Sequence, residues 1–260
     1  MNYINLIGFG VMGRQIAALS NILGYTVYVY NQSGIKKNYQ RFESDLRILN
    51  RILNTSSKPN IVEINDLSEF KDYLTIESIV ELKNEKMNVF EKLKFKNNIY
   101  TNSSSVIFDK ISFKVGILHF LNPISLKTVE VFSENNNIKL NEYLEKIKSI
   151  GFNIFFLESA NDHFINKVLF LEISSFFYLL EVIKIKYSIL KDIRSQFIAS
   201  NDLIKTINLI GVDVCYNIFC NFSKEHDKFR IPKTIIEALE RKILGKKNKT
   251  SIEILDIFKL

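Results

Sequence analysis

The chain has 260 residues, of which 47% are hydrophobic, and a formal net charge of +7. This hydrophobic content excludes a disordered chain, and the length allows one large domain or two modest ones. The basic balance favours an anionic ligand. The sequence has no basic run interleaved with aromatic residues of the kind that binds RNA, so we expect no nucleic-acid partner.

The first segment of the chain is a short apolar strand followed by a glycine loop, G-x-G-x-x-G, and the start of a helix. In this context the motif is typical of dinucleotide binding. Gly8 would make the turn, Gly10 would let the backbone approach a pyrophosphate, and Gly13 would let the helix pack on the strand. The N–H groups of the helix start, at Val11 and Met12, would face the phosphates.

Strand and helix patterns alternate over the following residues. We expect strands at 26–30, 61–64, 75–80, 99–102, 115–118, 129–132 and 152–157, and helices at 35–53, 67–73, 84–93 and 140–149. Such alternation predicts parallel strands joined by helical crossovers. Beyond residue 160 the strand patterns fade and long apolar helices dominate. The sequence therefore predicts a doubly wound, Rossmann-type α/β domain at 1–160 and a smaller all-helical domain at 161–260, with a helix N-cap region near 159–162.

The most apolar stretch, residues 164–183, carries three charged side chains, which favours a buried helix over a membrane span. No secretory leader pattern is present at the N-terminus. The two cysteines, Cys215 and Cys220, lack metal-ligand spacing, and we expect buried, reduced thiols. These features predict a cytoplasmic protein without a metal site and without a membrane partner.

Asn31 ends the second predicted strand, at the position where an acidic residue in this fold usually binds the adenosine ribose of NAD. An asparagine can still bind the ribose, but it lacks the negative charge that would repel a 2′-phosphate. Lys36 and Lys37 follow closely. The sequence therefore favours NAD and leaves NADP open.

His119 closes a predicted strand, and Glu130 lies within the next apolar strand. A single histidine at a strand end is more often structural than catalytic, and Glu130 alone could be a surface residue of an edge strand. Carboxylates are seldom buried without a partner, however. A His–Glu pair supplies a general base, because the carboxylate fixes the imidazole tautomer and favours the imidazolium.

Residues 101–105 form a run of small polar side chains, including Asn102 and Ser104, at the end of another predicted strand. Open α/β sheets bind ligands at this end of their strands. In isolation the run would be an ordinary loop or a helix cap. No general base lies nearby in the sequence, so we expect hydrogen bonding to a ligand and no covalent chemistry.

Taken in order, these segments resemble the 3-hydroxyacyl-CoA dehydrogenase family, including the bacterial 3-hydroxybutyryl-CoA dehydrogenases. The similar segments are G-x-G-x-M-G-x-x-I-A at 8–17, V-I-E-A-V-x-E with K-x-x-V-F at 76–90, T-N-T-S-S at 101–105, H-F-F-N-P with V-E-V at 119–131, F-I-V-N-R at 163–167 and G-L-D at 211–213. The resemblance implies an NAD(P)-dependent oxidoreductase acting on an acyl-CoA-type substrate. It also implies a homodimer formed through the helical domain.

The resemblance also implies roles for individual residues. His119 would remove the hydroxyl proton of the substrate and Glu130 would orient His119. Ser104 and Asn166 would bind the reacting oxygen. The cofactor side of the cleft would include Asn31, Glu81, Lys86 and Asn102 in addition to the glycine loop. A hydride would pass between C3 of the substrate and the nicotinamide ring.

Several positions depart from the family pattern. The His119–Glu130 spacing is about one residue shorter, so Glu130 could be displaced. Leu82 stands where the family has Asn, residues 161–162 are Asn-Asp where it has Pro-Gly, and its closing glycine-rich motif is reduced at 245–250. We predict a 3-hydroxyacyl-CoA dehydrogenase. The alternatives are a non-catalytic binding or assembly subunit with the same fold, and a dehydrogenase of a free hydroxy acid.

Overall fold

The computed structural model describes residues 2–93, 98–104, 115–160, 162–197, 202–224 and 227–255. The chain divides into two compact units, 1–163 and 164–260. The division falls just beyond the predicted domain boundary. Two residues of the predicted segments, Ser105 of the polar run and Asn161 of the cap region, lie outside the described residues.

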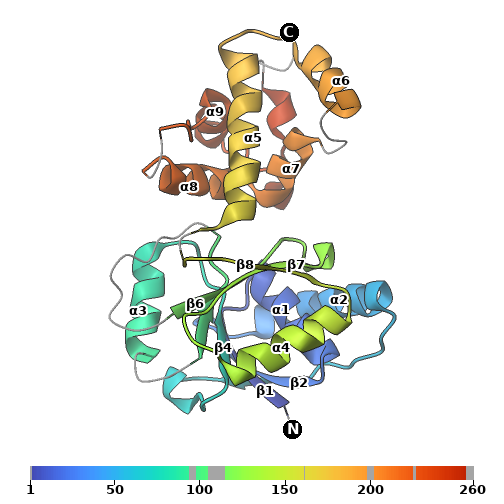
Figure 1. Cartoon of the computed structure of the whole chain (residues 1–260). Helices are drawn as coiled ribbons and strands as arrows, with labels where there is room; N and C mark the ends of the chain where they lie inside the picture. The colour runs from blue at the N-terminus through green and yellow to red at the C-terminus, as the bar shows by residue number, and fades with distance from the viewer. Residues whose placement is uncertain are drawn as a thin grey trace. The chain divides into compact units, whose positions relative to one another are not determined.

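The first unit is built on an eight-stranded sheet of order β3-β2-β1-β4-β5-β6-β7-β8 (Figure 1). The strands are β1 Asn2–Ile7, β2 Tyr25–Tyr30, β3 Ile61–Ile64, β4 Leu74–Glu77, β5 Ile99–Thr101, β6 Val115–Phe120, β7 Thr128–Phe132 and β8 Asn153–Phe156. The α-helices are α1 Val11–Ile22, α2 Lys36–Leu53, α3 Lys83–Leu93 and α4 Ile138–Ser149. This arrangement confirms the predicted doubly wound Rossmann-type fold.

One neighbouring pair of strands departs from the expected parallel arrangement. β7 runs antiparallel to β6, with His119 directly opposite Glu130 in the register. The connection between them contains only the short 3₁₀ helix Ile124–Leu126, which is too short for the crossover that a parallel pair requires.

Helices cover both faces of the sheet. On one face α1, α2 and α4 share a core with the central strands, including Phe9, Phe42 and Tyr143. On the other face α3 and the 3₁₀ helix Leu67–Glu69 pack a smaller core around Phe90. Two covered faces explain why the central strands are apolar on both sides. They also leave the strand ends as the place where polar side chains gather.

The second unit is helical. Its helices are α5 Phe164–Glu181, α6 Tyr187–Phe197, α7 Leu203–Ile210, α8 Val212–Phe222 and α9 Lys233–Glu240. Its core is rich in phenylalanine, and the rings of Phe170 and Phe219 meet edge to face with centroids 4.9 Å apart. Among the described residues no single helix is long and apolar enough to span a membrane. α7 and α8 reach that length and composition only together, and they are bent by 96°.

Helix α5 is apolar on more than one side. Phe170, Ile173 and Phe177 are among the side chains that it buries in the core of its own unit. A second row, Val168, Leu171 and Tyr178 within the helix and Val182 directly after its end, is between 38% and 68% exposed. The spacing of this second row, with Ser175 between Leu171 and Tyr178, alternates between three and four residues, which places it along one side of the helix.

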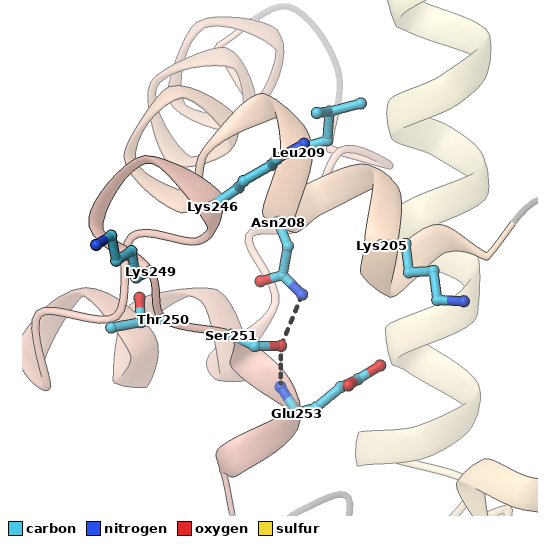
Figure 2. A pocket seen from close by; sticks show the side chains of 8 residues that line it. All are labelled: Lys205, Asn208, Leu209, Lys246, Lys249, Thr250, Ser251 and Glu253. Carbon is cyan, nitrogen blue, oxygen red and sulfur yellow. Dashed lines mark hydrogen bonds between the residues drawn. The ribbon is translucent and has the colours of Figure 1, made fainter.

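A pocket of about 570 Å³ lies in the second unit near the lysine-rich segment at 246–249. Two of its polar lining residues are hydrogen-bonded to each other, with the Asn208 amide donating to Ser251 Oγ at 2.9 Å. Figure 2 shows the side chains of Lys205 and Lys249 pointing to opposite sides of this pocket. The lysines therefore do not converge on a single anion.

Candidate active site

The glycine loop joins β1 to α1, and two of its glycines are required by the protein itself. Gly8 has φ +96°, and a Cβ there would lie 2.4 Å from the Ser78 carbonyl oxygen. A Cβ on Gly13 would lie 2.2 Å from the Gly8 carbonyl oxygen. The loop is thus packed between the start of α1 and the chain that leaves β4.

Gly10 differs from these two glycines. Its φ is −74°, which any residue can adopt, and among the described residues beyond its chain neighbours no atom lies within 4 Å of a Cβ built there. The protein therefore does not need a glycine at this position, and the space beside it is open. It adjoins the N-terminus of α1, whose exposed first residue is Val11. An open space beside a helix N-terminus fits a bound pyrophosphate.

Asn31 lies at the end of β2, where the ribose-binding residue was expected. Its Oδ1 accepts a hydrogen bond from Phe9 N at 3.0 Å, and its Nδ2 donates to Gly34 O at 2.7 Å and to Ser33 Oγ at 3.1 Å. Both amide hydrogens are thus used within the protein. Asn31 ties the glycine loop to the loop after β2, and an aspartate could not make the two donated bonds.

A buried carboxylate, Glu77, ends β4. It accepts hydrogen bonds from Ile79 N at 2.6 Å and Thr101 Oγ1 at 2.6 Å, and pairs with Lys86 Nζ at 2.8 Å. Glu77 and Lys86 are 0% and 1% exposed. Burial alone would lower the pKa of Lys86, but the carboxylates of Glu77 and Glu81 outweigh burial and raise it. Lys86 is therefore an ammonium, and Glu77 links the end of β4 to α3 through Lys86 and to the end of β5 through Thr101.

Glu81 extends this network to the polar run after β5. Lys86 Nζ lies 3.4 Å from its Oε2, and its Oε1 accepts hydrogen bonds from Ser103 Oγ at 2.8 Å and Ser104 N at 2.7 Å. Ser103 is buried and Ser104 is half-buried. Lys86 is buried against these two carboxylates, and through Glu81 it is linked to both serines.

Asn102 connects the same loop to the next strand. Its backbone N donates to Glu77 O at 2.7 Å, and its Oδ1 accepts from Phe120 N at 2.8 Å. Phe120 follows His119 on β6. The network around Glu77 is thereby linked through the backbone to the strand that carries the histidine.

His119 and Glu130 form the pair that the sequence predicted. His119 Nδ1 lies 2.7 Å from Glu130 Oε2, and the side chains are 4% and 0% exposed. The shorter spacing in the sequence does not displace Glu130, because the β6–β7 register sets it directly opposite His119. An ionised carboxylate only accepts hydrogen bonds, so Nδ1 carries the proton and Nε2 is the acceptor nitrogen of the ring.

Two further residues lie near the end of the first unit and the start of the second. His163, in the first unit, is 0% exposed, and its ring is edge-on to that of His119 with centroids 6.2 Å apart. Asn166 is buried in the first turn of α5, in the second unit. The role of Asn166 stays a prediction.

A family model described as "3-hydroxyacyl-CoA dehydrogenase, NAD binding domain" matches residues 3–151 of the chain. The match spans more than half of the chain and includes the glycine loop, Glu77 and the His119–Glu130 pair. The chain belongs to the 3-hydroxyacyl-CoA dehydrogenase family. Membership confirms the predicted dehydrogenase activity class and NAD as the cofactor of this domain.

Solved structures of similar fold include FadB2 of M. tuberculosis, with 19% identity, 96% of this chain and 97% of that chain covered, and a TM-score of 0.79. (S)-3-Hydroxybutyryl-CoA dehydrogenase PaaH1 of Ralstonia eutropha is 18% identical, with 97% of this chain and 98% of that chain covered and a TM-score of 0.79. 3-Hydroxybutyryl-CoA dehydrogenase of Escherichia coli is 21% identical, with 96% of this chain and 59% of that chain covered and a TM-score of 0.77. At such identities the likeness shows that this dehydrogenase shares their fold. A search of curated protein sequences finds no match.

Sequence reasoning missed two residues of this site. Glu77 could have been found, because it is a carboxylate inside an apolar strand, which is the argument that identified Glu130. His163 carried no comparable signal. Its closeness to His119 depends on how the chain returns after β8, which no local pattern shows.

Proposed function

We propose that this dehydrogenase transfers a hydride between C3 of a 3-hydroxyacyl-CoA, or a related 3-hydroxy acid, and the nicotinamide of NAD, with His119 as the general acid–base. The observation that carries the proposal is the buried His119–Glu130 pair at 2.7 Å. It belongs to the unit that contains the dinucleotide loop. A non-catalytic subunit would have no need of a buried histidine–carboxylate pair.

The chemistry of His119 follows from its pairing. In the oxidation direction Nε2 accepts the proton of the substrate hydroxyl as the C3–H bond breaks. NAD, when bound, supplies the acceptor for the hydride. The Glu130 carboxylate stabilises the imidazolium that forms and keeps the ring oriented. In reduction, Nε2 returns the proton to the oxygen.

Ser104 and Asn166 are proposed to bind the reacting oxygen. Ser104 is half-buried, with its backbone N and hydroxyl both donating to Glu81, so its orientation is set by the network around Lys86. To bind the reacting oxygen the hydroxyl must donate its hydrogen, so it would exchange its 3.2 Å bond to Glu81 for one to the substrate while the backbone N stays bound to Glu81. The proposal therefore assigns Glu81, Lys86 and Glu77 to positioning on the cofactor side.

The acyl-CoA substrate class is supported by the family and by the net charge of +7, which suits the phosphates of CoA. The R. eutropha and E. coli enzymes are 3-hydroxybutyryl-CoA dehydrogenases. We assign the thioester as substrate in preference to the free acid.

The test is NADH oxidation by the purified protein with acetoacetyl-CoA and, in parallel, with free acetoacetate. The proposal expects turnover of the thioester with a kcat/KM well above that of the free acid. Turnover of the free acid alone would overturn the substrate class. Binding of NADH without turnover of any 3-oxo compound would favour the assembly-subunit alternative.

We also propose a homodimer formed through α5. The exposed row Val168, Leu171, Tyr178 and Val182 would have to leave water for such a helix to be stable, and a two-fold partner would cover it. The sequence predicted α5 to be a buried helix, but within its own unit it is packed on only part of its circumference.

A further inference from the structure

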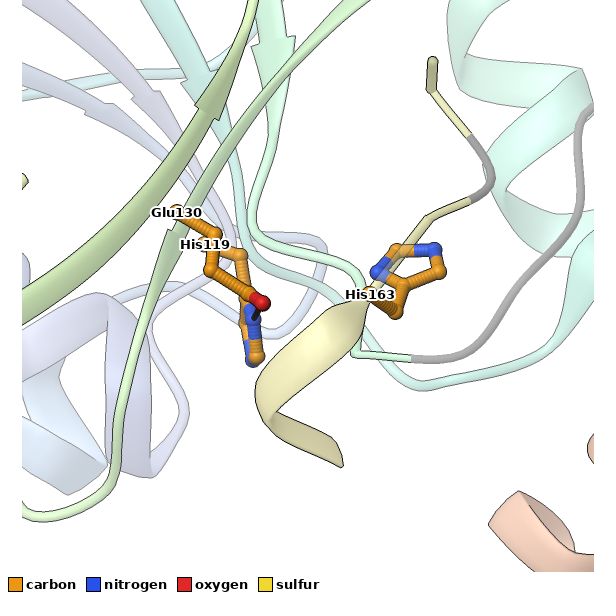
Figure 3. Close-up of side chains that lie close together, drawn as sticks. All are labelled: His119, Glu130 and His163. Carbon is orange, nitrogen blue, oxygen red and sulfur yellow. Dashed lines mark hydrogen bonds and ion pairs between the residues drawn. The ribbon is translucent and has the colours of Figure 1, made fainter. Parts of the chain in front are cut away.

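Among the described residues, one group of side chains has the composition of a metal site. His119, Glu130 and His163 each offer one ligand atom, and these atoms all lie within 4.8 Å of one another. All three residues are buried, and Figure 3 shows how their side chains lie. The expectation of no metal rested on the cysteines, and it did not consider histidines brought together by the fold.

His163 is what separates this group from an ordinary histidine–carboxylate pair. It stands where the motif F-I-V-N-R of the family begins with Phe, so the second imidazole is a departure of this chain. It also has φ +40°, a left-handed backbone conformation that is uncommon for a residue with a side chain. Such conformations tend to occur at functional sites.

We propose that His119, Glu130 and His163 bind a zinc ion. Two imidazoles and one carboxylate form a common ligand set for Zn²⁺, which leaves its fourth position to water or to a ligand. Glu77 and Glu81 also lie close together, but the Lys86 ammonium already occupies the position between them that a cation would take.

The geometry requires small adjustments. Zinc bonds of about 2.0–2.2 Å at tetrahedral angles place neighbouring ligand atoms about 3.3 Å apart. The His119 Nδ1–Glu130 Oε2 pair, now 2.7 Å apart, would open as zinc replaces the shared proton. His163 would move inward from its place within 4.8 Å of the other two ligand atoms.

With zinc on Nδ1 the ring proton moves to Nε2, so Nε2 could no longer accept the substrate proton, and Glu130 would no longer stabilise an imidazolium. The predicted consequence is reversible inhibition of the dehydrogenase by zinc. This consequence rests on the proposed function, in which His119 is the base. Binding of the metal does not rest on it.

The experiment titrates Zn²⁺ into EDTA-stripped protein against a chromogenic chelator, with Co²⁺ as a spectroscopic substitute that reports tetrahedral coordination. The variants are His163→Phe, which restores the residue of the family motif, and His226→Phe as the matched control at the histidine that is not one of the three proposed ligands. Changes around a metal site that leave its ligands in place already cost roughly 10–100-fold in affinity. Loss of the His163 ligand should therefore weaken binding at least about tenfold, and His226→Phe should not change it.

Unchanged NADH binding and thermal unfolding serve as the check on the fold of His163→Phe, and His163→Gln replaces it if it does not fold. The proposal is overturned if the wild type does not compete with the chelator, or if both His163 variants bind zinc as the wild type does. Zinc that binds through His163 yet leaves NADH oxidation unaffected would uphold the metal site and overturn His119 as the base.

Discussion

At the scale of single residues, the glycine loop separates positions that the fold requires from a position that only a ligand requires. A Cβ at Gly8 or Gly13 would lie 2.4 or 2.2 Å from a backbone carbonyl oxygen, so the fold accepts only glycine there. A Cβ at Gly10 would point into open space. The sequence motif treats the three glycines alike. Only the structure distinguishes their roles, because the distinction depends on Ser78, which follows a different strand.

Gly10→Val is predicted to abolish NADH binding while leaving the fold intact. The valine side chain would occupy the space expected for the pyrophosphate, and no protein atom stands in its way. Fluorescence titration with NADH measures the loss, and thermal unfolding checks the fold. Gly13→Val provides the contrast and should fail to fold, because its Cβ would meet the Gly8 carbonyl. Wild-type affinity in Gly10→Val would contradict the placement of the pyrophosphate.

Lys86→Met is predicted to destabilise the protein by about 3–5 kcal/mol, the usual cost of leaving one partner of a buried ion pair alone. Glu77 is 0% exposed, so Lys86→Met would leave its carboxylate buried without the ammonium. Urea unfolding measures the change. The double variant Glu77→Gln/Lys86→Met should be less destabilised than Lys86→Met, since no buried charge is left at that position. Equal losses in the two variants would speak against the pair as the source of the effect.

The sign of the pH dependence follows from the raised pKa of Lys86. Because this pKa is raised in the folded state, the stability that the ammonium contributes to folding is fully present below the ordinary pKa of lysine. It is lost only as the pH rises through the pKa of the folded state. The stabilisation by this network should therefore persist across neutral and mildly alkaline pH.

At the scale of elements, strand and helix positions could be predicted from local patterns, and their ends could not. The strand expected at 75–80 stops at Glu77, because the following residues turn to pack against Gly8. The helix expected at 67–73 is only a 3₁₀ turn, Leu67–Glu69, closed by a capping box from Asp66. Both outcomes depend on hydrogen bonds and contacts that a periodic pattern does not contain.

The exposed row on α5 carries the prediction of a dimer. Light scattering of the wild type should give twice the 30.3 kDa mass of the chain. Leu171→Glu should shift the mass to that of the monomer, because a charge would be buried at the interface. Ile48→Glu is the matched control, since Ile48 is a 52% exposed side chain on α2 of the other unit. A wild-type mass near 30.3 kDa would exclude the dimer.

At the scale of the whole molecule, the order of the segments was enough to predict the class of fold and the family. The alternation of strands and helices predicted the sheet, and the disappearance of strand patterns predicted the helical unit. The His119–Glu130 pair was also within reach, because a buried carboxylate needs a partner. The network through Glu77 and the approach of His163 were not predicted, since they join segments that are distant in the sequence.

The central claim is that a buried imidazole held by Glu130 moves the proton in an NAD-dependent hydride transfer. The most direct measurement compares the wild type with His119→Ala in NADH oxidation by acetoacetyl-CoA, with the dissociation constant of NADH measured for both. Loss of general acid–base help lowers the rate by about 10²–10⁴-fold. We expect a fall of that size in kcat with unchanged NADH binding, whereas near-normal turnover in His119→Ala would contradict the account.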